Sequence, residues 1–235
     1  MRLIFREFDD RSTLVGVLAD EISQHLKRAI SLRNRASLVA TGGTTVPPLY
    51  RRLRQTHLAW GQVNIALSDE RWSEQSTDSS NFNLVSSELL KEHAAAATLI
   101  PLRGEAETPE EAILAAHKEL GQLNFPFDIT LLGMGADMHA ASLLPDAPGV
   151  RDGLDRQSKD RVCKIGPIEG AADASIRMSL TLPTILASRV IYIMITGAEK
   201  RAAYEMALSS DEPIKAPVSA ILKQSVTPVY VYWAP

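Results

Sequence analysis

The chain has 235 residues, of which 45% are hydrophobic and 23% are charged. These fractions are typical of soluble globular proteins and exclude a disordered chain, and the length is sufficient for one α/β domain with a sizeable core. The formal net charge of -3 excludes a global basic field, so a nucleic-acid role would need a local patch of Lys and Arg.

The first predicted unit is a strand over residues 3–8 followed by a long helix. Asp9, Asp10 or Ser12 can cap this helix. Apolar residues at every fourth position form one side of it, and we expect that side to cover a sheet. These residues are Leu14, Leu18, Ile22, Leu26 and Ile30.

The second predicted strand, residues 37–40, ends in the turn Thr41-Gly42-Gly43-Thr44-Thr45, before a helix with prolines in its first turn. Such a turn offers free N–H donors, hydroxyl groups and the positive end of a helix dipole, which together favour a phosphate. It is not a Walker P-loop, because no Gly-Lys-Ser/Thr follows. Phosphate binding by this loop and a plain tight turn are both open.

The tightest basic cluster in the sequence is Arg51, Arg52 and Arg54. We interpret it as the solvated face of the second helix, because the basic residues share one short helical segment. We therefore expect no nucleic-acid partner.

Charged residues follow the next predicted strand, residues 63–67. Asp69-Glu70-Arg71 can be a solvated charge run. Alternatively, Arg71 presents its planar fork to phosphate oxygens, and Asp69 accepts hydrogen bonds from a sugar or orients a histidine. A polar loop over residues 73–80 then leads into a helix near Asn81.

A capping box predicts a helix that begins at Pro109, with Thr108 and Glu111 satisfying each other's backbone N–H groups. His117 lies near the apolar stripe of this helix, so we interpret it as structural. Three further histidines have no glycine turn or carboxylate arranged around them and are interpreted as structural or surface residues: His25, His57 and His93.

The most site-like segment is 128–145. Its apolar residues 129–132 predict a buried strand, which breaks at Gly133 and Gly135. In a parallel sheet this turn lies at the carboxyl end of its strand, where open α/β folds bind ligands. Three polar residues follow directly: Asp137, His139 and Ser142.

Two interpretations of this segment are open. In the first, the glycines are ordinary turn formers and His139 is an ordinary histidine on the first turn of a helix. In the second, the glycines let backbone N–H groups approach an anion, and His139 is a general base, because histidine changes its charge near neutral pH.

A single cysteine, Cys163, excludes an internal disulfide and a thiolate-rich zinc site. Residues 161–165 alternate like a strand that turns this cysteine to one face. We interpret Cys163 as a packed thiol, with a nucleophilic thiolate as the alternative. Before this strand, residues 145–160 predict a loop with one helical turn.

The last third of the sequence continues the alternation of strands and helices. A short helix is predicted over residues 184–187. A strand over 190–195 ends at Thr196-Gly197, and the helix that follows carries Lys200 and extends to about residue 208. Residues 217–222 predict a helix, and residues 226–233 a strand that closes the sheet. This alternation predicts one α/β domain, residues 1–235, with a doubly wound, largely parallel sheet and helices on both faces.

Several of these turns together resemble the 6-phosphogluconolactonases. That family shows a Gly-Gly-Ser/Thr loop, an Asp-Glu-Arg followed by Ser-Asn, a Gly-x-Gly-x-Asp-Gly-His-x-Ala-Ser-x-Phe-Pro segment, an Arg before a Thr-Leu/Pro stretch, and a Thr-Gly-x-x-Lys. The matching residues span nearly the whole chain in the same order: Gly42-Gly43-Thr44, Asp69-Glu70-Arg71 with Ser80-Asn81, Gly133 through Pro145, Arg177, and Thr196-Gly197-Ala198-Glu199-Lys200.

The resemblance implies a Rossmann-like fold and hydrolysis of 6-phospho-D-glucono-1,5-lactone to 6-phospho-D-gluconate, in the oxidative pentose phosphate pathway, without a metal or another cofactor. By matching position, His139 is expected to activate water, with Asp69 and Asp137 as further catalytic residues. Arg71 and Lys200 are expected to hold the phosphate. The other expected ligand-binding residues are Gly42, Gly43, Thr44, Asn81, Gly135 and Arg177.

The sequence departs from the family pattern at Met138, where the family has glycine, at Ala140, where threonine is usual, and at Leu144, which replaces phenylalanine. If the backbone of Met138 needs a positive φ, a methionine there costs on the order of 1–2 kcal/mol and tilts His139. A sugar-phosphate sensor without activity is therefore one alternative. The related glucosamine-6-phosphate deaminases are another, but their chemistry uses a carboxylate five residues after the turn histidine, where this chain has Leu144.

We expect a cytoplasmic monomer or small homo-oligomer that acts on a small phosphosugar lactone. No run in the sequence has the length and apolar character of a bilayer span, and no cationic start precedes an apolar segment with a small-residue cleavage site. We therefore expect no membrane partner.

Overall fold

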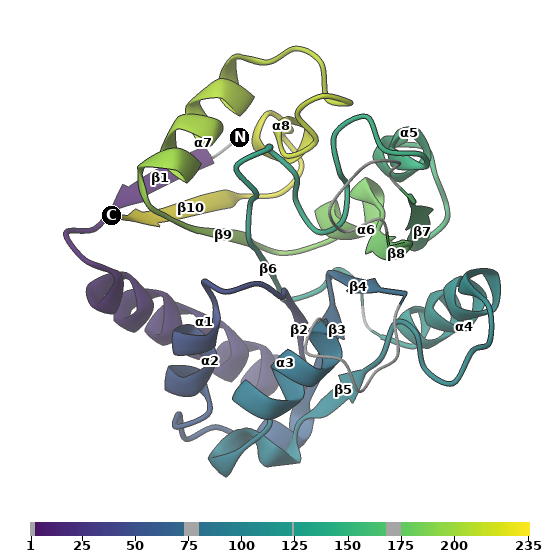
Figure 1. Ribbon diagram of the computed structural model, residues 1–235. Coiled ribbons are helices and arrows are strands. Elements are labelled where there is room, and N and C mark those ends of the chain that lie inside the picture. The colour runs from purple at the N-terminus through teal and green to yellow at the C-terminus, as the bar shows by residue number, and fades with distance from the viewer. Residues whose placement is uncertain (1–2, 73–79, 124, 168–174) are drawn as a thin grey trace.

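The computed structural model describes residues 3–72, 80–123, 125–167 and 175–235. Its main feature is a seven-stranded sheet in which all neighbouring strands are parallel (Figure 1). The strands are β1 (Leu3–Glu7), β2 (Ala36–Ala40), β3 (Val63–Leu67), β5 (Thr98–Ile100), β6 (Ile129–Leu132), β9 (Ile191–Thr196) and β10 (Val229–Ala234). Their order is β1-β10-β9-β6-β2-β3-β5. The predicted doubly wound α/β fold is confirmed.

Helices cover both faces of this sheet. Figure 1 shows α1, α2 and α3 on one side and α6, α7 and α8 on the other. The helices are α1 (Arg11–Arg33), α2 (Pro47–Leu53), α3 (Asn81–Glu88), α4 (Pro109–Gly121), α5 (Val150–Leu154), α6 (Leu182–Leu186), α7 (Ala198–Ser209) and α8 (Ser219–Leu222), with short 3₁₀ helices η1 (Trp60–Gln62) and η2 (Glu92–Ala96). Within the described ranges, no helix combines the length and the apolar character needed to cross a membrane.

Helix α1 forms as its periodicity predicts. Its N-cap is Asp10, whose carboxylate accepts a hydrogen bond from the N–H of Thr13 at 2.8 Å. Four of the five stripe residues are fully buried, namely Leu14, Leu18, Ile22 and Leu26. The fifth, Ile30, is partly buried. The helix therefore supplies one continuous apolar face to the core.

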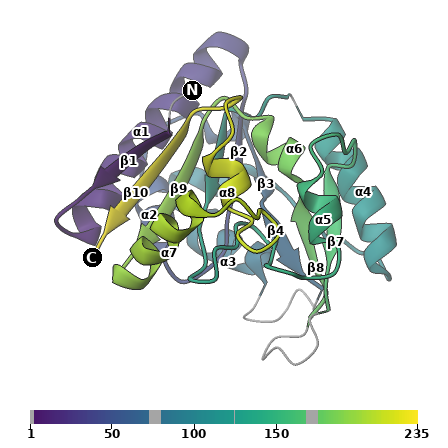
Figure 2. The same cartoon turned by 90° about the horizontal axis from the view of Figure 1, so that it is seen from above.

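A second, three-stranded antiparallel sheet was not predicted. It consists of β4 (Asp69–Arg71), β8 (Arg177–Leu180) and β7 (Val162–Ile165) in the order β4-β8-β7. Figure 2 shows β7 and β8 at the end of the molecule opposite β1. Ser68 joins the two sheets, because its N–H donates to the carbonyl of Ala40 and its carbonyl accepts from the N–H of Leu180, both at 2.8 Å. Strand β4 has no hydrophobic residue, and β8 alternates polar and apolar residues over only four positions, which is a short signal for a strand.

Three further expectations are wrong in detail. Strand β10 does not close the sheet, because β1 pairs with its outer edge. The segment around His139 is an irregular loop and not the first turn of a helix. In α4, Thr108 Oγ1 accepts the N–H of Glu111 at 3.2 Å as predicted, but the Glu111 carboxylate accepts the N–H of Glu107 at 3.1 Å instead of that of Thr108. Residues 73–79 of the predicted polar loop lie outside the described residues.

Cys163 lies on β7 with its Sγ 3.6 Å from the carbonyl oxygen of Ser179. Burial raises the pKa of its thiol to about 12, so the sulfur is a neutral thiol near pH 7. This agrees with a packed cysteine and not with a nucleophile.

Candidate active site

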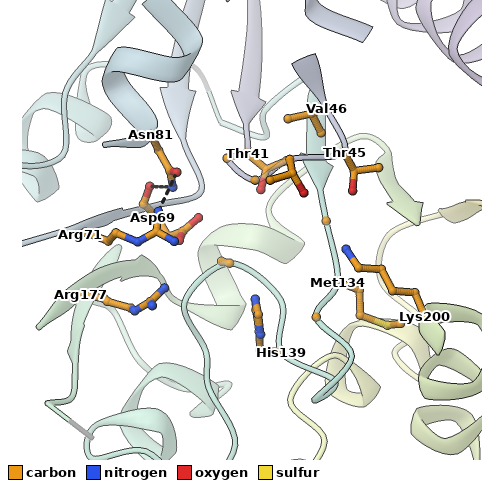
Figure 3. Close-up of a pocket in the computed structure, with 16 residues that line it drawn as sticks. Thr41, Thr45, Val46, Asp69, Arg71, Asn81, Met134, His139, Arg177 and Lys200 are labelled. Carbon is orange, nitrogen blue, oxygen red and sulfur yellow. Dashed lines mark hydrogen bonds between the residues drawn. The ribbon is translucent and has the colours of Figure 1, made fainter. Parts of the chain in front are cut away.

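The carboxyl ends of β2, β6 and β9, together with β4 and β8, surround a cavity of about 280 Å³ (Figure 3). All of the predicted site residues except Asp137 line it: Gly42, Gly43, Thr44, Asp69, Arg71, Asn81, Gly135, His139, Arg177 and Lys200. The cavity is also lined by small or apolar residues that were not predicted as site residues: Thr41, Thr45, Val46, Gly133, Met134 and Ala141. Their positions beside the predicted glycines are the one signal that could have found them.

Asp137 contacts the imidazole of His139 and does not itself line the cavity. Its Oδ1 lies 2.6 Å from Nδ1 of His139 and also accepts the backbone N–H of His139 at 3.2 Å. Burial raises the pKa of Asp137, but the hydrogen bonds and charge of His139 outweigh this effect, so the pKa lies below its ordinary value. An ionised carboxylate can only accept, so Nδ1 carries the proton, and in the neutral form of the imidazole the lone pair is on Nε2.

The pair fits its loop because residue 135 is a glycine. A Cβ at Gly135 would lie 2.2 Å from Oδ1 of Asp137 and 2.3 Å from Nδ1 of His139. The N–H of Gly135 also donates to the carbonyl of His139 at 3.1 Å, which closes the loop. Glycine is therefore required here by close approach and not by its φ.

Met138 has a φ of 68°, which is the left-handed region that favours glycine. Its N–H donates to the carbonyl of Gly135 and its carbonyl accepts the N–H of Val218, both at 3.0 Å. The strained residue is thus held on both sides, and His139 keeps its contact with Asp137. Ala141 in the same loop also has a positive φ, 52°.

Asp69 lies in a buried hydrogen-bond network. One carboxylate oxygen accepts from Ser68 Oγ and the other from Ser142 Oγ, both at 2.6 Å. The residue is 7% exposed, so the interpretation as a solvated charge run is wrong. The Ser142 contact ties the loop of His139 to β4, while Asp137 is the carboxylate that orients the imidazole.

Glu70 has a structural role at the start of α3. Its carboxylate accepts the backbone N–H groups of Arg71, Asn81 and Phe82 at 2.8 to 2.9 Å, and the hydroxyl of Ser80 at 3.1 Å. Burial raises its pKa, and these N–H donors oppose the rise. Glu70 therefore fixes Arg71 and Asn81 beside each other at the rim of the cavity.

Asn81 brings the glycine loop and β4 together. Its Nδ2 donates to the carbonyl of Asp69 at 2.9 Å, and its Oδ1 accepts from Nη1 of Arg71 at 3.4 Å. A Cβ at Gly42 would lie only 1.8 Å from that Oδ1. Gly42 thus lets the loop after β2 pack directly on the Asn81 amide.

Cationic side chains stand on two sides of the cavity. Arg71 and Arg177 are directly opposite each other in the β4–β8 pair, whereas Lys200 extends from the first turn of α7 (Figure 3). Burial lowers the pKa of Lys200, and the charges of Glu199 and Asp137 partly offset this. Two guanidinium groups facing an ammonium group across a cavity favour an anionic ligand between them.

Comparisons with known proteins identify the same family as the sequence motifs. A family model described as glucosamine-6-phosphate isomerases/6-phosphogluconolactonase matches residues 9–233. The chain is 37% identical to the 6-phosphogluconolactonase of Mesorhizobium japonicum, over 97% of this chain and 94% of that protein. It is 34% identical to the 6-phosphogluconolactonase of Rhizobium meliloti, over 97% of each. A crystal structure of a 6-phosphogluconolactonase from Shewanella baltica matches with a TM-score of 0.94 and 34% identity, over 100% of this chain and 98% of that one.

Proposed function

Because the chain belongs to the glucosamine-6-phosphate isomerase/6-phosphogluconolactonase family, we propose that it hydrolyses 6-phospho-D-glucono-1,5-lactone to 6-phospho-D-gluconate, a step of the oxidative pentose phosphate pathway. The observation that carries this proposal is the Asp137–His139 pair, whose imidazole lines a cavity with Arg71 and Lys200 on opposite sides. A base and a phosphate clamp are the two parts that this reaction needs.

His139 is the general base in this proposal. With Nδ1–H held by Asp137, Nε2 takes a proton from water as the water oxygen attacks the lactone carbonyl carbon. The tetrahedral intermediate then collapses with cleavage of the bond from that carbon to the ring oxygen. The imidazolium returns its proton to the ring oxygen, which becomes the hydroxyl of the product. A lactone reacts in this way with an oriented water, without a nucleophilic serine.

The phosphate is held by Arg71 and Lys200 in this proposal, with Arg177 beside Arg71 and the Gly42-Gly43-Thr44 loop close to the ligand. A phosphate at this place neutralises the cations on both sides of the cavity. It also fixes the distance between the lactone carbonyl and His139, which is how binding at a remote group contributes to the rate.

A deaminase is a poorer fit. The proton relay of the glucosamine-6-phosphate deaminases needs a carboxylate five residues after the turn histidine, and this chain has Leu144 there. A leucine side chain cannot transfer a proton.

A pH-stat assay with freshly prepared lactone tests the proposal. We expect acid release above the spontaneous rate, in proportion to protein concentration, and an unchanged rate after treatment with a chelator. A protein that binds 6-phosphogluconate but leaves lactone hydrolysis at its spontaneous rate would be a sensor, and the proposal would be wrong.

A further inference from the structure

A second cavity, of about 290 Å³, lies at the opposite ends of the strands of the main sheet from the candidate active site. It is lined at the amino ends of β2, β3 and β6, whereas the candidate active site lies at their carboxyl ends. We call it the arginine pocket, after three of its lining residues, Arg33, Arg35 and Arg189. The pocket is also lined by Asp128, Ser37, Asn64, Leu123 and Phe125.

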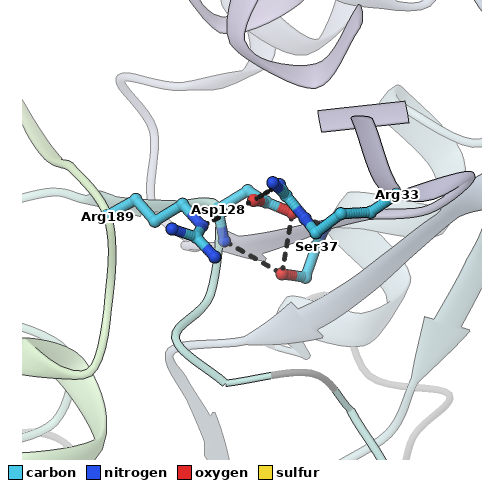
Figure 4. Close-up of polar contacts among 4 residues, drawn as sticks. All are labelled: Arg33, Ser37, Asp128 and Arg189. Atoms are coloured by element: carbon cyan, nitrogen blue, oxygen red, sulfur yellow. Dashed lines mark hydrogen bonds and ion pairs between the residues drawn. The ribbon is translucent and has the colours of Figure 1, made fainter. Parts of the chain in front are cut away.

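Asp128 is the buried centre of the arginine pocket and is 7% exposed (Figure 4). Its Oδ1 contacts Nη2 of Arg33 and lies 3.3 Å from Nε of Arg189. Its Oδ2 accepts the backbone N–H of Ser37 at 2.9 Å, and its own N–H donates to Ser37 Oγ at 2.9 Å. One fixed carboxylate therefore orients two guanidinium groups that come from distant parts of the chain.

The charges of the arginine pocket do not balance. Three guanidinium groups and one carboxylate leave a formal charge of +2. Arg35 is exposed, and within the described part of the chain it makes no ion pair or hydrogen bond. The side chains of Arg33 and Arg189 are 31% and 50% exposed and each contacts Asp128 through one nitrogen, so their other N–H groups can reach a ligand.

This donor set suits a phosphate. A guanidinium fork matches two oxygens of a phosphate group, and several forks around one cavity favour a dianion over a single carboxylate. Leu123 and Phe125 form an apolar part of the lining, and Asn64 of β3 pairs with Ser37 of β2. An organic group attached to the phosphate would cover that apolar part.

We propose that the arginine pocket binds a phosphate monoester, with the phosphate against Arg33, Arg35 and Arg189 and the organic part on the side of Phe125. This site is separate from the candidate active site and does not depend on the proposed function.

Site-resolved NMR tests the proposal with two probes, adenosine monophosphate and inorganic phosphate. We expect adenosine monophosphate to shift the backbone amide signals of Ser37 and Asn64 in the full chain. Arg35→Ala should weaken this binding about tenfold or more, because a hydrogen bond to a charged group is lost. Arg151→Ala, an exposed arginine on α5, is the matched control and should leave the affinity unchanged.

Arg189→Gln is a second variant, because Arg33 remains to pair with Asp128 and the fold should persist. It should also weaken binding. Shifts confined to Gly42 and Gly135, or no shift at Ser37 and Asn64 at millimolar probe, would overturn the proposal. Equal affinity for the two probes would support the phosphate site and overturn the role of the apolar part of the lining.

Discussion

Oδ1 of Asp137 lies 2.6 Å from Nδ1 of His139, and the carboxylate itself does not line the cavity. We therefore propose that Asp137 is a positioning residue for His139. In Asp137→Asn the charge that holds the Nδ1–H tautomer is lost, and we expect kcat to fall by about 100-fold or more with little change in KM. Steady-state kinetics with the lactone measure this, and a rise in KM at constant kcat would show that Asp137 acts on binding instead.

Two neighbouring alanines in the loop of His139 provide a matched test of backbone strain. Both are buried, but Ala141 has a φ of 52° whereas Ala140 does not have a positive φ. Replacement by glycine removes the same methyl group at each position, so the difference isolates the left-handed conformation. We expect Ala141→Gly to be more stable than Ala140→Gly by about 1–2 kcal/mol in the free energy of unfolding.

Urea unfolding of the two variants gives this difference. Equal free energies of unfolding would show that the positive φ of Ala141 carries no strain. The same reasoning applies to Met138, with a φ of 68°, but its larger side chain packs on the core and complicates the comparison.

Gly42 and Asn81 should be energetically coupled. Gly42→Ala places a Cβ 1.8 Å from the present position of Asn81 Oδ1, so the amide must move and its 2.9 Å hydrogen bond to Asp69 is lost. We expect Gly42→Ala to destabilise the protein much less in an Asn81→Ala background. A double-mutant cycle should give a coupling free energy of about 1 kcal/mol or more, and additive effects would contradict the contact.

Glu70 should make the free energy of unfolding depend on pH. Burial raises its folded-state pKa above the ordinary value of 4.5, against the N–H donors of Phe82, Asn81 and Arg71. The folded protein then binds the proton more tightly than the unfolded chain, so the contribution of Glu70 to stability is greatest below pH 4.5 and falls as the pH rises through the folded-state pKa.

Urea unfolding of the native chain and of Glu70→Gln, from about pH 4 to about pH 8, measures this dependence. The stability advantage of the native chain over the variant should decrease with rising pH. An advantage that grows with rising pH would mean that the N–H donors outweigh burial and lower the pKa.

The elements with strong periodicity were predictable from the sequence. Helix α1 and strands β2, β6 and β9 carry long apolar patterns, and the turns after these strands carry the glycines that led to the cavity. Strands β4 and β8 were not predictable, since their pairing depends on contacts between segments more than 100 residues apart. For the same reason the Ser142–Asp69 contact and the arginine pocket were found only from the structure.

In the proposed reaction, His139 removes a proton from water while Arg71 holds the phosphate. Lactone hydrolysis by the native chain, His139→Ala and Arg71→Ala, together with the affinity of each for 6-phosphogluconate, tests it most directly. We expect His139→Ala to lose about 100-fold to 10,000-fold in kcat with nearly unchanged product affinity, and Arg71→Ala to bind product more weakly. A His139→Ala protein that hydrolyses the lactone at the native rate would contradict this proposal.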